Sequence, residues 1–285
     1  MENKNRIKNF LKIILRIFIL LLAIAVFTSG IMLAISLIFY GKTYFNSDYK
    51  NANLVMLMGT TGQLLAGIFF VKFILKKKID YIFFKKEGLA KNICIGLFLG
   101  LLQISIYVLL DMGRGVLVYS GSSFGNFNLI LLAYFVGFFI QSTSEEVLVR
   151  GILTRVLSDR FGRNVAILLP SIFFGLLHLG NEGVTIISTL NTILVGIFFA
   201  KLLFYKENIM LTSGVHAGWN FSMAMIYGLN VSGFSGFDSL LNFKILNYNL
   251  YDEIYGPEGS IVVTFIEIIS IFIIFYLERR KEVNK

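Results

Sequence analysis

Three short polar motifs interrupt apolar stretches of the chain, and their side chains are of the kinds that activate water. The motifs are Glu145-Glu146…Arg150, Phe174…His178 and His216…Asn220. Two neutral imidazoles and a carboxylate suit zinc with one position open for water. Alternatively, a buried carboxylate can act alone as a general base, while imidazole and amide N–H groups stabilise an oxyanion. Peptide-bond hydrolysis fits either scheme.

The two adjacent glutamates are expected to have different tasks. Neighbouring residues of a helix point about 100° apart, whereas residues four apart share a face. We therefore predict that Glu145 faces a cavity and that Glu146 pairs with Arg150, although the reverse assignment also fits the spacing. A purely structural interpretation stays open as well, in which the ion pair and the histidines only tie helices together.

The spacing also predicts that the three motifs lie at one depth. Glu145 precedes Phe161 by 16 residues and His178 follows it by 17, so an antiparallel helical hairpin turning at Phe161 places them side by side. His216 lies 8 residues after Asn208, where another apolar stretch begins. Charged groups inside spanning helices are costly and usually mark a functional interior.

The composition indicates what positions these side chains. Of 285 residues, 56% are hydrophobic and only 15% are charged, and the mean hydropathy is +0.76. Soluble domains carry about 25% charged residues. We therefore predict an all-α polytopic membrane protein and exclude a disordered or disulfide-rich chain, since there are 2 Pro and 1 Cys. The net charge of +9 is read as membrane topology and not as nucleic-acid binding.

About eight transmembrane helices are expected, because a span needs about 20 mainly apolar residues. The expected spans are Ile17–Tyr40, Asn53–Val71, Asn92–Leu110, Leu129–Leu157, Asn164–His178, Val184–Ala200, Ile209–Leu229 and Ile261–Leu277. With this count, 22 of the 26 Lys and Arg residues fall on one side, which predicts that both termini are cytoplasmic. The first span is longer than a signal peptide and is interpreted as a retained anchor.

Three regions follow from this pattern: residues 1–125 with three spans, 126–230 as the helical core that carries the motifs, and 231–285 with an outer loop and the last span. The outer segment from Asn230 to Ser260 is acidic and aromatic, and it could be a lid or a simple loop. Gly96 and Gly100 form a small-residue pair in the third span, for which we expect packing within the chain. The oligomeric state cannot be read from the sequence.

Together the motifs EExxxR, FxxxH and HxxxN, in this order on successive helices, resemble the CPBP family of CAAX-type prenyl-protein endopeptidases and bacteriocin-processing or immunity (Abi) proteins. The resemblance covers roughly Leu129 to Leu229. It implies an intramembrane endopeptidase whose active site lies in a helical cavity. One EExxxR motif alone would be weak, but the three together are fairly specific.

The resemblance also implies a role for each residue. Glu145 would activate water together with His178, while His216 and Asn220 would stabilise the oxyanion. Glu146, Arg150 and Phe174 would support them. A metalloprotease is the form we expect, with zinc as the cofactor and Glu145, His178 and His216 as its tentative ligands. The motif itself leaves open whether zinc or a glutamate-activated water is used.

The expected substrate is a membrane-associated peptide or protein precursor in the lipid bilayer of a cell membrane, and the composition suggests a bacterial source. No nucleic-acid partner is expected. The alternative function is a non-catalytic immunity or scaffold protein of the same family, and a third is a transporter in which Glu145 and the histidines relay protons. Serine and aspartyl intramembrane chemistry fit worse, since no serine motif or pair of aspartates occupies the spans.

Overall fold

The computed structural model describes residues 2–40, 52–126 and 129–283, and almost all of its regular structure is helical. The α-helices are α1 (Glu2–Tyr40), α2 (Ala52–Gly59), α3 (Thr61–Phe69), α4 (Leu89–Gly113), α5 (Leu129–Glu146), α6 (Thr154–Phe161), α7 (Arg163–Leu177), α8 (Ile186–Lys206), α9 (Ile209–Phe221) and α10 (Ile261–Val283). The protein is an all-α polytopic membrane protein, as its composition predicts.

Wider, π-helical turns continue three of these helices. They are η2 (Phe70–Ile74) after α3, η5 (Val147–Leu153) after α5 and η6 (Ser222–Ile226) after α9. Segment η5 joins α5 to α6, so this span runs as one helix from Leu129 to Phe161. Such turns are rare and often occur at functional sites. Here one begins directly after Glu146 and contains Arg150.

Each of the eight expected spans coincides with a helical segment. Five helices are long and apolar enough to cross a membrane by length and composition: Leu15–Ile38, Ala52–Ile74, Leu89–Gly113, Ile186–Lys206 and Ile261–Val283. Helix α7 is apolar but shorter. The remaining two of the eight expected spans correspond to α5 and α9. Helix α5 carries Glu145 and Glu146, and α9 carries His216 and Asn220.

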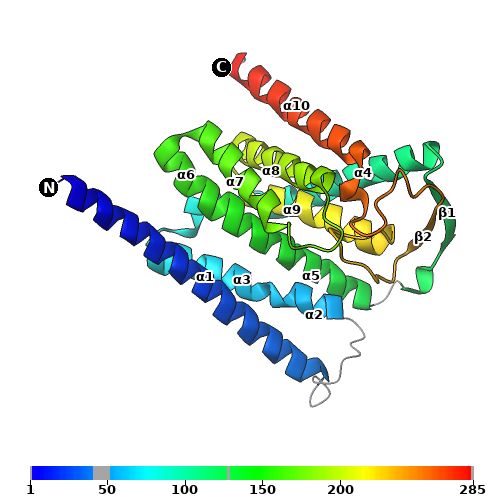
Figure 1. Ribbon diagram of the computed structural model, residues 1–285, viewed down its shortest axis with the longest axis horizontal. Helices are drawn as coiled ribbons and strands as arrows, with labels where there is room; N and C mark the ends of the chain where they lie inside the picture. Colours follow the sequence, from blue (N-terminus) through cyan, green and yellow to red (C-terminus); the bar gives the residue numbers. More distant parts are fainter. Residues whose placement is uncertain (1, 41–51, 127–128, 284–285) are drawn as a thin grey trace.

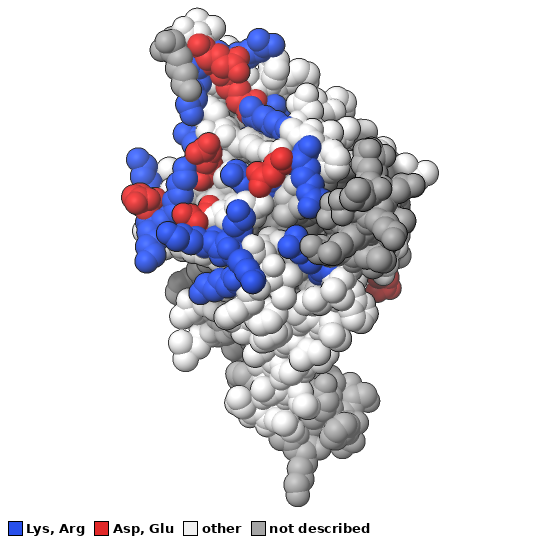
Figure 2. Space-filling view, turned by 90° about the vertical axis from the view of Figure 1, so that its left-hand side faces the viewer, with Lys and Arg blue, Asp and Glu red and all other residues white. Residues whose placement is uncertain are grey.

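The two ends of the helical bundle differ in charge. Both chain termini and the turn between α6 and α7 lie at the same end, on the left in Figure 1, while the strands lie at the opposite end. Lys and Arg side chains gather on that left-hand face, with Asp and Glu among them (Figure 2). This arrangement agrees with the charge asymmetry of the sequence, which predicts that this end is cytoplasmic.

Helix α9 lies at the centre of the bundle, and every residue from Ile209 to Asn220 is buried. Its close neighbour is α4, and glycines allow the contact. A Cβ on Gly96 or Gly100 would meet the backbone of α9, and one on Gly214 or Gly218 would meet the backbone of α4. The expectation that Gly96 and Gly100 serve packing within the chain is confirmed.

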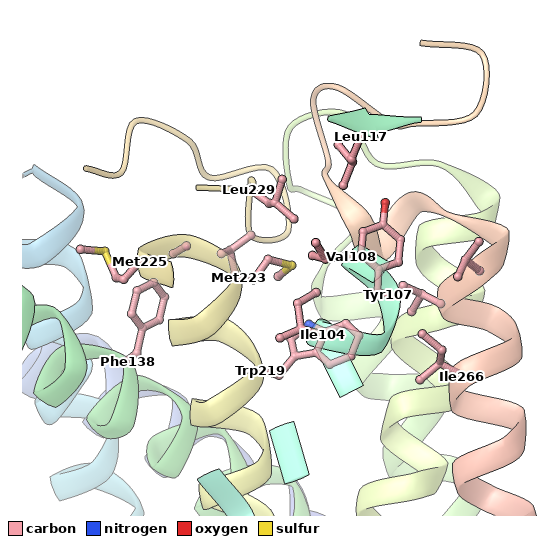
Figure 3. Packing of buried hydrophobic residues seen from close by; sticks show 14 of the residues in the cluster. Ile104, Tyr107, Val108, Leu117, Phe138, Trp219, Met223, Met225, Leu229 and Ile266 are labelled. Atoms are coloured by element: carbon pink, nitrogen blue, oxygen red, sulfur yellow. The ribbon is translucent and has the colours of Figure 1, made fainter. Parts of the chain in front are cut away.

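A two-stranded antiparallel sheet caps the opposite end of the bundle. Strand β1 (Leu117–Ser122) pairs with β2 (Leu241–Ile245), and Leu117 lies opposite Ile245. Beneath it, a hydrophobic core joins α4, α9 and α10, including Tyr107, Trp219 and Ile266 (Figure 3). Three short 3-10 segments complete the described chain: η3 (Ile79–Ile82), η4 (Phe124–Asn126) and η7 (Pro257–Gly259). Part of the outer segment is thus ordered structure.

Candidate active site

A cavity of about 1070 Å³ lies between the helices and collects the predicted site residues. Glu145 from α5, His178 from the end of α7, and His216 and Asn220 from α9 all line it. Three separate segments of the chain therefore contribute the predicted site residues to one cavity. Phe174 lines the same cavity, whereas Glu146 and Arg150 do not belong to its lining.

Glu146 and Arg150 form a sealed ion pair behind the cavity. Arg150 Nη1 lies 3.3 Å from Glu146 Oε1, and the exposed fractions of the two side chains are 1% and 0%. The guanidinium also stacks over the Phe174 ring, 4.0 Å from its centroid. Of the two possible assignments, the structure selects the pairing of Glu146 with Arg150.

Glu145 differs from its neighbour because its carboxylate faces open space. Its side chain is 26% exposed and lies 3.8 Å from His216, measured from Oε2 to Nε2. Gln141, one helical turn earlier, donates from Nε2 to Glu145 Oε1 at 2.6 Å. The Glu145 Oε2 atom is buried and has no hydrogen-bond partner among the described residues.

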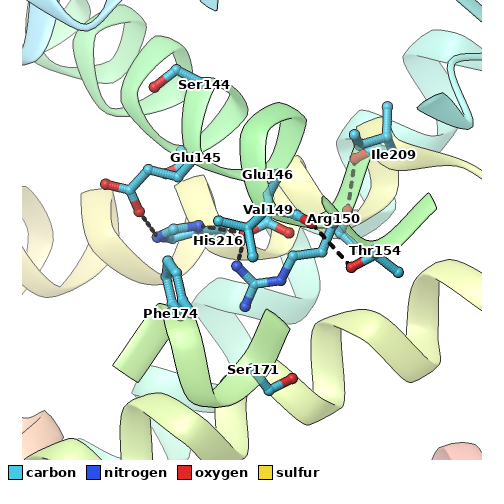
Figure 4. Close-up of polar contacts among 12 residues, drawn as sticks. Ser144, Glu145, Glu146, Val149, Arg150, Thr154, Ser171, Phe174, Ile209 and His216 are labelled. Atoms are coloured by element: carbon cyan, nitrogen blue, oxygen red, sulfur yellow. Dashed lines mark hydrogen bonds and ion pairs between the residues drawn. The ribbon is translucent and has the colours of Figure 1, made fainter. Parts of the chain in front are cut away.

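His216 lies between the two carboxylates (Figure 4). Its Nδ1 atom is 3.1 Å from Glu146 Oε1, and a carboxylate can only accept at that distance, so Nδ1 carries a proton. Its Nε2 atom points towards Glu145. The sealed ion pair thereby orients the ring that faces the cavity, in the manner of a supporting carboxylate in other histidine sites.

The backbone sets the tautomer of His178. Its Nδ1 atom is 2.8 Å from the carbonyl oxygen of Phe174, which can only accept, so Nδ1 is the protonated nitrogen. In the neutral ring Nε2 is then free to accept a hydrogen bond. Phe174 also packs edge-to-face against His178, with ring centroids 4.7 Å apart, and holds the ring in place.

Asn220 is connected to Glu145 through Gln141. The Asn220 side-chain amide donates to Gln141 Oε1 at 3.3 Å, and Gln141 in turn donates to Glu145. An asparagine amide has two N–H groups, so one of them can serve another acceptor. Gln141 is a site residue that the motifs missed, although its place four residues before Glu145 on a spanning helix could have indicated it.

Part of this core resembles a known family. Residues 127–222 match the family of type II CAAX prenyl endopeptidase Rce1-like proteins. The matched segment is similar to these proteins. The match confirms the resemblance that the three motifs predict, and it ends two residues after Asn220. No protein with curated annotation matches the chain.

The predicted zinc ligands of the Rce1-like core do not meet at one point. Among the residues that the structure describes, no three His, Cys, Asp or Glu side chains are grouped so that they could hold a metal ion. The Nδ1 atoms of His178 and His216 contact the Phe174 carbonyl and Glu146, respectively. The chemistry derived below therefore uses the protein's own groups.

Two further acids line the cavity of the Rce1-like core from outside the matched segment. Glu258, from η7, accepts hydrogen bonds at Oε2 from Ser232 N at 2.8 Å and from Ser232 Oγ at 2.5 Å. Removal from water raises the pKa of Glu258 above its ordinary value, and the Ser232 hydrogen bonds oppose that shift. Glu267, from α10, is 1% exposed. Glu267 lies in the eighth expected span and belongs to none of the three motifs, so the sequence analysis did not identify it as a site residue.

Proposed function

We propose that the protein is an intramembrane endopeptidase that hydrolyses a peptide bond in a membrane-associated peptide or protein precursor with a glutamate-activated water. The observation that carries this proposal is the position of Glu145, whose carboxylate faces the cavity beside His216 while its neighbour Glu146 is sealed. The Rce1-like match supports the same class of reaction.

Attack on the substrate begins with a water between Glu145 and His178. The water donates one hydrogen to the Glu145 carboxylate and the other to His178 Nε2, which the contact of His178 Nδ1 leaves available. Glu145 takes a proton as the water oxygen bonds to the scissile carbonyl carbon. The carbonyl π-electrons move to oxygen, and a tetrahedral oxyanion forms.

The oxyanion is stabilised by α9. In the protonated form of His216, Nδ1 donates to Glu146 and Nε2 donates to the oxyanion. Asn220 contributes its second amide N–H. When the C–N bond breaks, the proton held by Glu145 passes to the departing amine, which yields a carboxylic acid and a free amine and restores the Glu145 carboxylate.

The walls of the cavity suit a substrate that lies in or against lipid. Apolar side chains from α1, α5–α6 and α7 line it, among them Leu20, Val156, Leu169 and Phe173. A peptide with an apolar segment could leave the bilayer for these walls without exposing that segment to water. We place the protein in a bacterial cell membrane and take a peptide precursor as its substrate class.

The test uses the full-length protein in lipid nanodiscs and a library of acylated, fluorescence-quenched peptides, with fragments identified by mass spectrometry. We expect defined cleavage by the wild type and a roughly 10²–10⁴-fold lower rate in Glu145→Gln, since a positioned general base contributes that much. Glu253→Gln, at an exposed loop position outside the cavity, is the matched control and should cleave normally.

The competing function is a non-catalytic immunity or scaffold protein, which needs only the fold. It is distinguished by measuring bacteriocin resistance of cells that carry the same variants at equal abundance. Bacteriocin resistance that survives in Glu145→Gln and His178→Ala, together with no peptide cleavage by the wild type or the variants, would support the scaffold function and contradict the enzyme function.

A further inference from the structure

The cavity contains a second acidic region beyond the reaction site. Glu267 on α10 lines the cavity wall, is 1% exposed, and has no hydrogen-bond partner for either carboxylate oxygen among the described residues. A buried carboxylate in a spanning helix is costly without a partner. Its position in the wall of a cavity therefore points to a partner that arrives with a ligand.

Glu258 lines the same cavity as Glu267 and is held firmly in place by hydrogen bonds. Ser232 donates twice to its carboxylate. The backbone carbonyl oxygen of Glu258 accepts a hydrogen bond from the Asn191 side chain on α8 at 2.8 Å. Glu258 and Glu267 line the same cavity as His178 and His216.

The lining has few positive groups to balance these acids. Among the described lining residues, the only Lys or Arg side chains are Arg16 near the start of α1 and Arg160 at the α6–α7 turn. Both of these segments lie at the basic end of the bundle, whereas Glu258 directly precedes the first turn of α10 at the other end. A cation that enters with the substrate would be attracted to the acidic end.

The shape of this region favours a long basic side chain over a metal ion. The two carboxylates are fewer than the three ligands that a protein metal site commonly supplies, and no larger group is found among the described residues. Trp219 and Val263 line the same cavity. An apolar wall with a charge at its end suits the alkyl stem and charged head of Lys or Arg.

We propose that Glu258 and Glu267 form a subsite that binds a Lys or Arg side chain of the peptide substrate and so fixes which peptide bond faces Glu145. This inference rests on the proposed endopeptidase function and names its specificity. The two glutamates contact the substrate side chain and take no part in bond breaking.

The test scans each position of the quenched peptide library with Lys, Arg, norleucine and Glu. We expect the wild type to cleave peptides with Lys or Arg at one position at least about tenfold faster, by kcat/KM, than the norleucine peptide. Glu267→Gln should reduce that ratio to near one. Glu258→Gln is a second variant at the same subsite, and Glu253→Gln is the control.

Two results would overturn the subsite: no preference for a basic residue at any position, or a preference that persists in both Glu258→Gln and Glu267→Gln. A wild type that cleaves no peptide would refute the endopeptidase function but not yet the subsite. Fluorescence anisotropy with the same Lys and norleucine peptides then decides it. Tighter binding of the Lys peptide that vanishes in Glu267→Gln supports the subsite, and equal binding of both peptides refutes it.

Discussion

Glu145 and Glu146 are neighbours in the chain but belong to two regions with opposite physical character. The first region is the sealed layer, which is buried away from solvent. In it, Glu146 contacts both Arg150 and His216 Nδ1. In front of it lies the cavity wall, where Glu145 is partly exposed and one of its oxygens lacks a partner. The ring of His216 is the connection between the two.

This contrast indicates how a membrane protein keeps a reactive carboxylate in a fixed position. The sealed layer is charge-balanced, because the guanidinium faces the carboxylate, and it orients the imidazole that reaches the cavity. The cavity wall differs in exposure, since Glu145 is 26% exposed there, whereas buried atoms without a hydrogen-bond partner occur in both regions. Substitutions in the first region should therefore affect folding, and those in the second should affect chemistry.

The largest effect is expected in the sealed layer. Arg150→Ala leaves Glu146 buried without its counter-charge, and we expect the free energy of unfolding to fall by about 3–5 kcal/mol. Thermal unfolding in detergent and protein abundance in membranes measure this loss. Arg155→Ala is the matched control, since Arg155 pairs with Asp159 at 3.3 Å in an exposed place and such pairs contribute about 0–1 kcal/mol. Equal losses in the two variants would contradict the contrast.

The next effect concerns the cavity side of α9. Asn220→Ala removes an oxyanion donor, and we expect kcat to fall by roughly 10²–10³-fold while the melting temperature changes little. Steady-state cleavage of the best library peptide and a thermal melt on the same sample test both parts. A variant that loses its fold instead of its rate would assign Asn220 to the sealed layer.

A smaller effect is expected at the boundary of the two regions. Gln141→Ala removes the amide that donates to Glu145 and accepts from Asn220. A hydrogen bond to a charged group contributes about 1.5–3 kcal/mol, so we expect kcat/KM to fall by about tenfold or somewhat more. Gln103→Ala, which removes another amide of the cavity lining, is the comparison and should change the rate much less.

The smallest effect is expected from metal removal. Because the described acids and histidines form no three-residue metal group, treatment with EDTA should leave the cleavage rate within about twofold of its starting value, given the ligand number that zinc needs. The rate is measured before treatment, after it, and after addition of zinc. Full loss that zinc restores would instead support the predicted zinc set of Glu145, His178 and His216.

Much of this arrangement could be predicted from the sequence, because the membrane requires apolar lengths and makes charges conspicuous. The eight helical segments and the presence of Glu145 and both histidines in one cavity follow from that pattern. Gln141 was missed because an amide does not stand out beside two acids. Glu267 was missed because a single acid in an apolar helix gives no motif, and only the folded chain shows that it reaches the same cavity.

Other features depend on long-range contacts and could not be predicted. The pairing of β1 with β2 joins segments more than a hundred residues apart, and no local pattern predicts that contact. Glu258 was visible as an acid in an outer loop. Its role as a lining residue depends on Ser232 and on Asn191, which hold it from separate segments.

The most direct test of the central claim compares Glu145→Gln with Glu146→Gln, two identical changes at adjacent positions. The measurement is the cleavage rate of one library peptide together with the melting temperature of each purified variant. We predict that Glu145→Gln keeps the wild-type melting temperature and loses cleavage, whereas Glu146→Gln lowers the melting temperature. Wild-type cleavage by Glu145→Gln at normal abundance would contradict the account.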